Sequence, residues 1–311
     1  MKRRRKSGLP DLKLLATEKT NRAASDLDLK SALEIAQIIN AEDARVAVAV
    51  KRVLPQIARA IDVVAAALRK NGRLIYVGTG TSGRIAALDA AECPPTFSTN
   101  AQAVQFVMAG GQKALAAAVE ADEDSCDLGR QEMANKNPGR KDVIVGITAS
   151  GRTPFTVAAV QYARSRGAKT IALTCNRNSP LEKAADLAIV IEVGPEVVAG
   201  SSRMKAGSAQ KMVLNILSTG AMARLGYVYG NLMVSTQLKN AKLRERGVGI
   251  LQRVAAVDRR RAQDALRTAK HRLPVALVML VAGVNRARAE HALKATSGHV
   301  RKAIATASRT K

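Results

Sequence analysis

The sequence has very few aromatic residues, with no tryptophan, three phenylalanines and four tyrosines among 311 residues. Nucleic-acid-binding proteins combine a basic surface with aromatic stacking platforms or a recognisable reading helix. With so few aromatic residues, the formal net charge of +25 favours a solvated basic surface that attracts anionic substrates over specific nucleic-acid binding. The excess of basic over acidic residues is unevenly distributed along the chain, since 17 basic but only 4 acidic residues lie from Lys242 onward.

Cysteine and histidine are also scarce. Cys93, Cys126 and Cys175 form no C-x-x-C pair and have no metal-ligand spacing, so we expect reduced thiols and no metal site. The three histidines all lie from His271 onward. Their position argues against a Ser/His/Asp or Cys/His mechanism.

No apolar run reaches the length of a membrane span, and the longest candidate, residues 273–282, is bounded by Arg272 and Gly283. The basic residues at 1–6 precede no long apolar core, which argues against a secretory signal. We therefore expect a cytoplasmic protein without a membrane partner. With 47% apolar residues, the chain is long enough for one large domain and a smaller one.

A glycine-rich loop, Gly78-Thr79-Gly80-Thr81-Ser82-Gly83-Arg84, stands between a short apolar run and a helical run of small residues. Such a loop binds anions through backbone N–H groups and the helix dipole. The spacing matches G-x-G-x-x-G, but residues 93–119 contain no Asp or Glu to hold a dinucleotide ribose. The loop hydroxyls favour a phosphorylated small molecule instead. The predicted contacts are Gly80, Thr81, Ser82 and Gly83.

The region after Arg73 alternates between two kinds of segment. Apolar or β-branched runs at residues 74–77, 104–108, 143–147, 170–174 and 187–191 are typical of buried parallel strands. Helical runs lie near residues 84–91, 112–121, 154–166 and 181–185. The pattern predicts an α/β fold with a doubly wound five-stranded parallel sheet in the flavodoxin-like order 2-1-3-4-5.

Helices are expected on both sides of this region. A capping box at residues 31–34 starts a helix through Asn40, and residues 41–69 supply one or two more. A long helix runs to Leu225, and later helices are predicted at residues 260–270, 274–281 and 286–295. The expected organisation is a basic flexible arm at 1–12, a sugar-phosphate domain with N-terminal helices at 13–240, and a small helical domain at 241–311.

Two further turns repeat the chemistry of the first loop. Thr148-Ala149-Ser150-Gly151-Arg152-Thr153-Pro154 follows the third strand, which neighbours the first strand in the predicted order, so both loops face one crevice. The turn at residues 200–208 opens the long helix and adds fixed cations. These turns contribute further residues to the predicted site, namely Thr148, Ser150, Gly151, Thr153, Ser201, Ser202, Arg203 and Lys205.

Three strings together resemble the N-acetylmuramic acid 6-phosphate etherase family, which is built on the sugar isomerase (SIS) domain. They are the first loop running on to Asp89-Ala90-Ala91-Glu92-Cys93-Pro94-Pro95-Thr96, then residues 149–154, and Gly200-Ser201-Ser202-Arg203-Met204-Lys205-Ala206-Gly207. The likeness runs from about Thr17 to the last helices. The departures are the extension before Leu9, Thr79 where the family often has Ala, and Ala91 where it often has Ser.

The resemblance implies cleavage of the D-lactyl ether of N-acetylmuramic acid 6-phosphate in cell-wall recycling, without a metal or organic cofactor, by a homodimer. The family's acid/base glutamates correspond to Glu92 and Glu123, with Glu92 suggested as the acid and Glu123 as the base. Two carboxylates suffice, because the ring-opened aldehyde acidifies the C2 proton and different environments can separate the two pKa values.

Two other functions remain open at the level of the sequence. A SIS-domain sensor would bind a sugar phosphate through the same hydroxyl loops without needing both glutamates. A sugar-phosphate isomerase on the same fold would also remove a C2 proton with a carboxylate, and only the E-C-P-P-T string around Glu92 argues against it.

Overall fold

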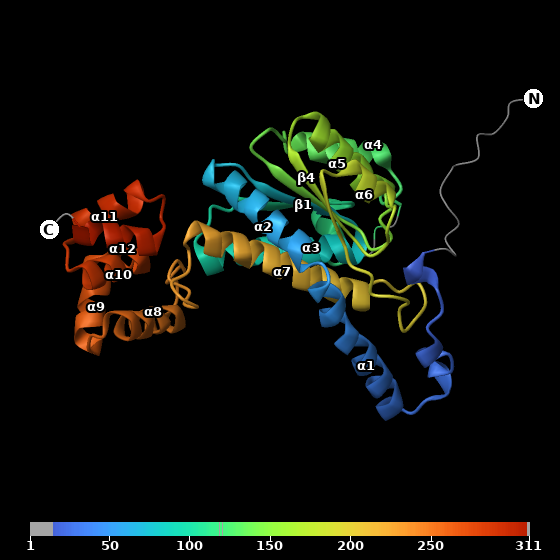
Figure 1. The fold of residues 1–311 in the computed structure, drawn as a ribbon, viewed down its shortest axis with the longest axis horizontal. Coiled ribbons are helices and arrows are strands. Elements are labelled where there is room, and N and C mark those ends of the chain that lie inside the picture. The colour runs from blue at the N-terminus through green and yellow to red at the C-terminus, as the bar shows by residue number, and fades with distance from the viewer. Residues whose placement is uncertain (1–14, 118, 120, 310–311) are drawn as a thin grey trace, which may run out of the picture. The chain divides into compact units, whose positions relative to one another are not determined.

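Five short strands form the central sheet of the computed structural model, which describes residues 15–309 apart from 118 and 120 (Figure 1). The expected basic arm at residues 1–12 lies outside the described residues. The strands are β1 (Leu74–Gly78), β2 (Val104–Met108), β3 (Val143–Ile147), β4 (Lys169–Thr174) and β5 (Leu187–Val190). Their order, β2-β1-β3-β4-β5, confirms the prediction. Strands β3, β4 and β5 pair in parallel.

Three helices cover one face of this sheet (Figure 1). They are α4 (Cys126–Asn135), α5 (Pro154–Ser165) and α6 (Pro180–Ala184). Their apolar side chains share a core with those of the strands, including Ile144, Phe155 and Leu181. Helix α4 packs so closely on α5 that a Cβ at Gly129 would lie 2.2 Å from the Phe155 carbonyl oxygen. This contact fixes the start of α5, where the second hydroxyl-rich loop ends.

The helices before the sheet are α1 (Ala32–Lys51) and α2 (Leu54–Arg69), preceded by the 3-10 helices η2 (Ala16–Glu18), η3 (Arg22–Ala24) and η4 (Leu27–Leu29). The predicted capping box is confirmed, because the Ser31 and Glu34 side chains each accept from the other residue's backbone N–H. The expected end at Asn40 was wrong. No glycine or proline interrupts the next eleven residues, so the helix continues to Lys51.

The helix predicted at residues 112–121 was also wrong. The described residues of this segment contain only the 3-10 helix η5 (Gly111–Leu115), which follows left-handed φ values of 75° and 58° at Gly110 and Gly111. The α-helix begins later, because Ser125 accepts from the Leu128 N–H and caps α4. The alanine-rich composition of the segment was therefore outweighed by left-handed glycines before it and a helix cap after it.

The two helices that follow the first and third loops are long. Helix α3 spans Gly80–Phe97 and α7 spans Lys205–Leu225. Both begin inside the predicted loops, so each loop contributes the first turn of its helix. No helix of the described residues is long and apolar enough to cross a membrane.

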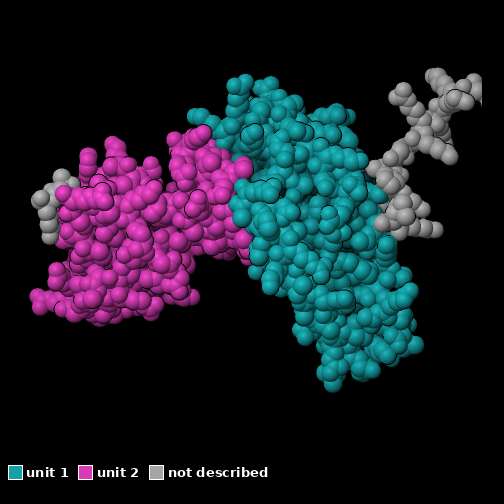
Figure 2. Space-filling view, viewed as in Figure 1, with its two compact units in different colours: residues 1–60, 75–87, 106–214 teal, residues 61–74, 88–105, 215–311 magenta. Residues whose placement is uncertain are grey.

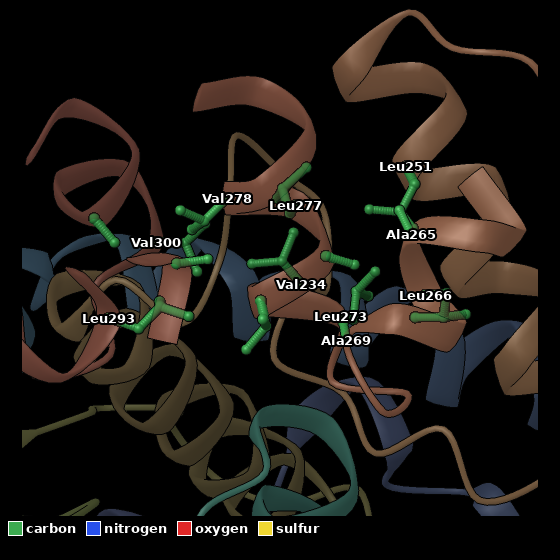
Figure 3. Packing of buried hydrophobic residues seen from close by; sticks show 14 of the residues in the cluster. Val234, Leu251, Ala265, Leu266, Ala269, Leu273, Leu277, Val278, Leu293 and Val300 are labelled. Atoms are coloured by element: carbon green, nitrogen blue, oxygen red, sulfur yellow. The ribbon is translucent and has the colours of Figure 1, made fainter. Parts of the chain in front are cut away.

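The C-terminal helices share a separate apolar core (Figure 3). They are α8 (Ala241–Ala255), α9 (Arg259–Thr268), α10 (Leu273–Ala282), α11 (Arg286–Ala295) and α12 (Val300–Arg309). Helix α10 contacts each of the other four and buries Leu273, Leu277 and Val278. Its Pro274 occupies the first turn, as predicted. Helices α8 and α12 were not predicted, because each buries a single apolar stripe within a strongly basic sequence.

The chain divides into two compact units (Figure 2). One unit contains residues up to 60 together with 75–87 and 106–214, and the other contains 61–74, 88–105 and the residues from 215 onward. The three hydroxyl-rich loops and Glu123 belong to the first unit. Glu92 and the C-terminal helices belong to the second.

Candidate functional site

The first loop makes a sharp turn between β1 and α3. Gly80 is the first residue of α3 and has a left-handed φ of 51°. A Cβ at Gly83 would lie 2.7 Å from Met108 Cγ and 2.9 Å from the Gly78 carbonyl oxygen, so only glycine fits this position. The close turn places the N-terminus of α3 directly after the strand, which is the geometry that favours anion binding.

The second loop gathers three predicted hydroxyl groups. Thr148 Oγ1 lies 2.8 Å from Thr153 Oγ1 and 3.2 Å from Ser150 Oγ. Gly151 has a φ of 72°, and a Cβ there would lie 2.3 Å from Ser179 Cβ. The structure therefore brings these side chains into one cluster at the start of α5.

The first and second loops leave the sheet side by side. A Cβ at Gly78, the last residue of β1, would lie 3.0 Å from the carbonyl oxygen of Ile147, the last residue of β3. Neighbouring parallel strands end at the same edge of a sheet, where ligands of open α/β folds bind. The two loops thus open at adjacent strand ends.

Glu123 lies between these two loops. Its carboxylate Oε2 accepts a 2.9 Å hydrogen bond from Thr79 Oγ1 in the first loop. Its backbone carbonyl accepts a 3.1 Å hydrogen bond from the N–H of Phe155, at the start of α5. The side chain is half-buried. The structure therefore places this predicted base, which the sequence located only in an acidic cluster, against the first loop.

The third turn also reaches the first loop. A Cβ at Gly207 would lie 3.4 Å from Thr81 Cγ2, and Ser82 Oγ donates a 2.9 Å hydrogen bond to Oε1 of Gln210 on α7. Sequence reasoning missed Gln210, because a glutamine one turn into a helix carries no motif. Ser201 and Ser202 are half-buried and Arg203 is exposed, so these predicted contacts are accessible.

Lys205 is the predicted cation with the most protein partners. Its side chain is buried, and Nζ donates to Glu42 Oε2 on α1. Its backbone N–H and that of Ala206 donate to the carboxylate of Glu196, at 3.0 and 2.9 Å. Burial raises the pKa of Glu196. The backbone N–H groups at the start of α7 thus bind the protein's own Glu196 carboxylate. A role of Lys205 in binding substrate stays a prediction.

Glu92 lies on α3 in the second unit, where it is exposed. Its neighbours in the E-C-P-P-T string are held by the protein, since Thr236 Oγ1 donates a 3.1 Å hydrogen bond to the Pro95 carbonyl. Burial raises the pKa of the Cys93 thiol to about 12, with a further contribution from the charge of Asp89. Asp89 is buried and accepts from Asn215 and Ser218. Glu92 is therefore the accessible acid of this string, and its acid role stays a prediction.

Comparison with known proteins identifies the type of domain. The model of the glucokinase regulatory protein N-terminal SIS domain matches residues 56–164, and the SIS domain model matches residues 130–219. The solved structure of a phosphoheptose isomerase from Francisella tularensis is 19% identical, with a TM-score of 0.50, and the match covers 62% of this chain and 100% of that chain. That similarity shows the fold alone. The sheet and its loops are those of an SIS-domain protein.

Curated relatives then identify the family. The N-acetylmuramic acid 6-phosphate etherase of Aeromonas hydrophila subsp. hydrophila is 50% identical over 270 residues, which cover 87% of this chain and 91% of the relative. The etherase of Klebsiella aerogenes is 47% identical over 295 residues, which cover 95% and 98%. The chain belongs to the N-acetylmuramic acid 6-phosphate etherase family, which confirms the resemblance seen in the sequence.

Proposed function

We propose that this protein is a carbon–oxygen lyase that cleaves the D-lactyl ether of N-acetylmuramic acid 6-phosphate. The products are D-lactate and N-acetylglucosamine 6-phosphate. The observation that carries the proposal is the position of Glu123, whose carboxylate is bonded to the first loop while its backbone is bonded to the start of α5. The curated relatives at 47% and 50% identity bear the name of this activity.

The phosphate of the substrate binds, in this proposal, between the first and second loops. The N-terminus of α3 supplies backbone N–H groups and a partial positive charge. The cluster of Thr148, Ser150 and Thr153 supplies hydroxyl donors from the neighbouring strand end. An anion held there would bring the sugar close to Glu123, because that carboxylate contacts the first loop.

Glu123 acts as the base. Ring opening of the sugar exposes an aldehyde at C1, which acidifies the C2 proton, and the Glu123 carboxylate takes that proton. The electron pair forms the C2–C3 double bond as the C3–O bond breaks. The lactate oxygen then takes a proton from an acid, for which we propose Glu92. Water adds to C3 of the unsaturated aldehyde and a proton returns to C2, which gives N-acetylglucosamine 6-phosphate.

Incubation with N-acetylmuramic acid 6-phosphate in deuterated water tests this proposal. We expect stoichiometric D-lactate and N-acetylglucosamine 6-phosphate that carries deuterium at C2. An isomerase would convert an aldose phosphate to a ketose phosphate without lactate, and a sensor would bind the sugar phosphate unchanged. Either result would refute the proposed activity.

Two variants separate the roles of the glutamates. Glu92→Gln is expected to exchange the C2 hydrogen with solvent while releasing almost no lactate, whereas Glu123→Gln is expected to do neither. Acid or base assistance is worth about 100- to 10,000-fold in rate. Exchange that survives in Glu123→Gln and vanishes in Glu92→Gln would reverse the assignment. Ordinary lactate release by both variants would remove the pair from the mechanism.

A further inference from the structure

The hydrogen bond between Thr79 and Glu123 joins a loop residue to the proposed base across 44 positions of sequence. An ionised carboxylate only accepts hydrogen bonds, so the Thr79 hydroxyl is the donor. Thr79 is 7% exposed and lies directly after β1. Because a β-branched side chain has few χ1 rotamers, its hydroxyl points in a defined direction.

The second oxygen of the Glu123 carboxylate, Oε1, lies close to the first loop as well. A Cβ at Gly80 would lie 3.2 Å from Glu123 Oε1, so this oxygen lies over the first residue of α3. The backbone of Glu123 is held separately by the Phe155 N–H. The glutamate itself stands in a turn before α4. The Glu123 side chain has several rotatable bonds. Among the described residues, the Thr79 hydroxyl donates the hydrogen bond that orients its carboxylate.

We propose that Thr79 is a positioning residue, which holds the Glu123 carboxylate in the orientation that removes the C2 proton. The inference rests on the proposed lyase activity and adds to it a residue that does not itself contact the reacting atoms. A positioned base reacts faster than a freely rotating one, because the orientation has been fixed before the reaction. Thr79 should therefore affect turnover rather than substrate affinity.

Isosteric variants isolate the hydroxyl group. Thr79→Val keeps the branched shape and removes the hydroxyl, and Thr79→Ser keeps the hydroxyl and removes the methyl group. We expect Thr79→Val to lower kcat for lactate release by about 10- to 100-fold, the range for a hydrogen bond to a charged group, with KM changed by less than about 2-fold. Thr79→Ser should recover most of the loss.

Thr156→Val is the matched control. Thr156 is fully buried in α5, and its hydroxyl has no hydrogen-bond partner among the described residues. This variant should keep the wild-type kcat, because it removes a buried hydroxyl without touching Glu123. A Thr79→Val loss that is no larger than the Thr156→Val loss would overturn the proposal.

Two further readouts distinguish positioning from a general structural effect. The rate of C2 hydrogen exchange in deuterated water should fall in Thr79→Val by the same factor as lactate release. In the Glu123→Gln background, Thr79→Val should cause no further decrease in the residual rate of lactate release. A rise in KM at unchanged kcat would mean that Thr79 contacts the substrate, and an undiminished Thr79→Val effect without Glu123 would mean that it acts elsewhere. Either result would refute the positioning role.

The failure of this inference can be told apart from the failure of the proposed function. If the wild-type protein releases no lactate, the lyase activity is wrong, and the positioning role in that reaction falls with it. If the wild type is active and Thr79→Val matches it in kcat and exchange rate, only the positioning role is wrong. A thermal unfolding curve of each variant verifies that the compared proteins are folded.

Discussion

At the scale of single residues, the site depends on hydroxyl groups whose partners the sequence does not reveal. The types and order of residues in the loops were enough to predict that the hydroxyl groups of Thr148, Ser150 and Thr153 lie together. The partners of Thr79 and Ser82 were not predictable, because Glu123 and Gln210 lie 44 and 128 positions away. Such contacts depend on the packing of α7 and of the turn before α4, which no local pattern specifies.

Substitution of Ser150 tests the placement of the phosphate. Loss of one hydroxyl donor to a charged group should lower kcat/KM of Ser150→Ala by about 10- to 100-fold, mainly through KM. Ser165→Ala is the matched control, because Ser165 is exposed at the end of α5, the helix that follows the second loop, and its hydroxyl donates to the Tyr162 carbonyl. Equal kinetic constants for Ser150→Ala and the wild type would show that the phosphate binds elsewhere.

At the scale of secondary-structure elements, the strands were more predictable than the helices. Strands β1 and β3 are buried along their whole length, and a short run of β-branched and apolar residues is sufficient evidence for such a strand. Helix ends depend on caps and on glycine conformation. The misplaced helix at residues 112–121 shows this dependence, since Ser125 and the left-handed Gly110 and Gly111 decide where α4 can begin.

The contact between α1 and α7 is expected to make folding sensitive to acid. Burial acts to raise the pKa of Glu42, but hydrogen bonds from Lys205 and Arg45 outweigh it and lower the pKa below the ordinary value of 4.5. A carboxyl with a lowered pKa in the folded state contributes stability above its ordinary pKa and loses that contribution as the pH falls. The free energy of unfolding should therefore decrease below about pH 4.5.

Variants of the Glu42–Lys205 pair test this expectation by chemical denaturation. Glu42→Gln leaves the buried ammonium of Lys205 without its charge partner and should cost about 3–5 kcal/mol at neutral pH. The double variant Glu42→Leu with Lys205→Met removes both charges and should recover much of that loss. It should also show a smaller change in stability between pH 6 and pH 4. A neutral-pH stability of Glu42→Gln equal to the wild type would contradict the expectation.

At the scale of the whole molecule, the family membership and the surface of α1 lead us to propose a homodimer. Leu33 and Val48 on this helix are 69% and 53% exposed, and Leu29 just before it is 81% exposed. A second chain packed on this helix would remove these apolar side chains from water. A crevice open at one edge of an SIS domain would be closed by such a partner.

Light scattering at micromolar concentration tests the dimer. We expect twice the mass of one chain for the wild type and a lower mass for a Leu33→Glu, Val48→Glu double variant, with reduced lactate release. Lys51→Glu, an exposed change at the end of the same helix, controls for the added charge. A fully active monomer would show that the exposed residues of α1 serve another purpose.

The division of the chain into units limits how the protein can be cut or recombined. Each compact unit is assembled from three separate segments of the chain, and the boundaries at residues 60 and 87 fall inside α2 and α3. A protease that cleaves within either helix therefore severs a continuous element and frees no intact unit. The two outer segments, residues up to 60 and residues from 215 onward, could each be exchanged in a single genetic event, and either event would divide a helix, α2 or α7.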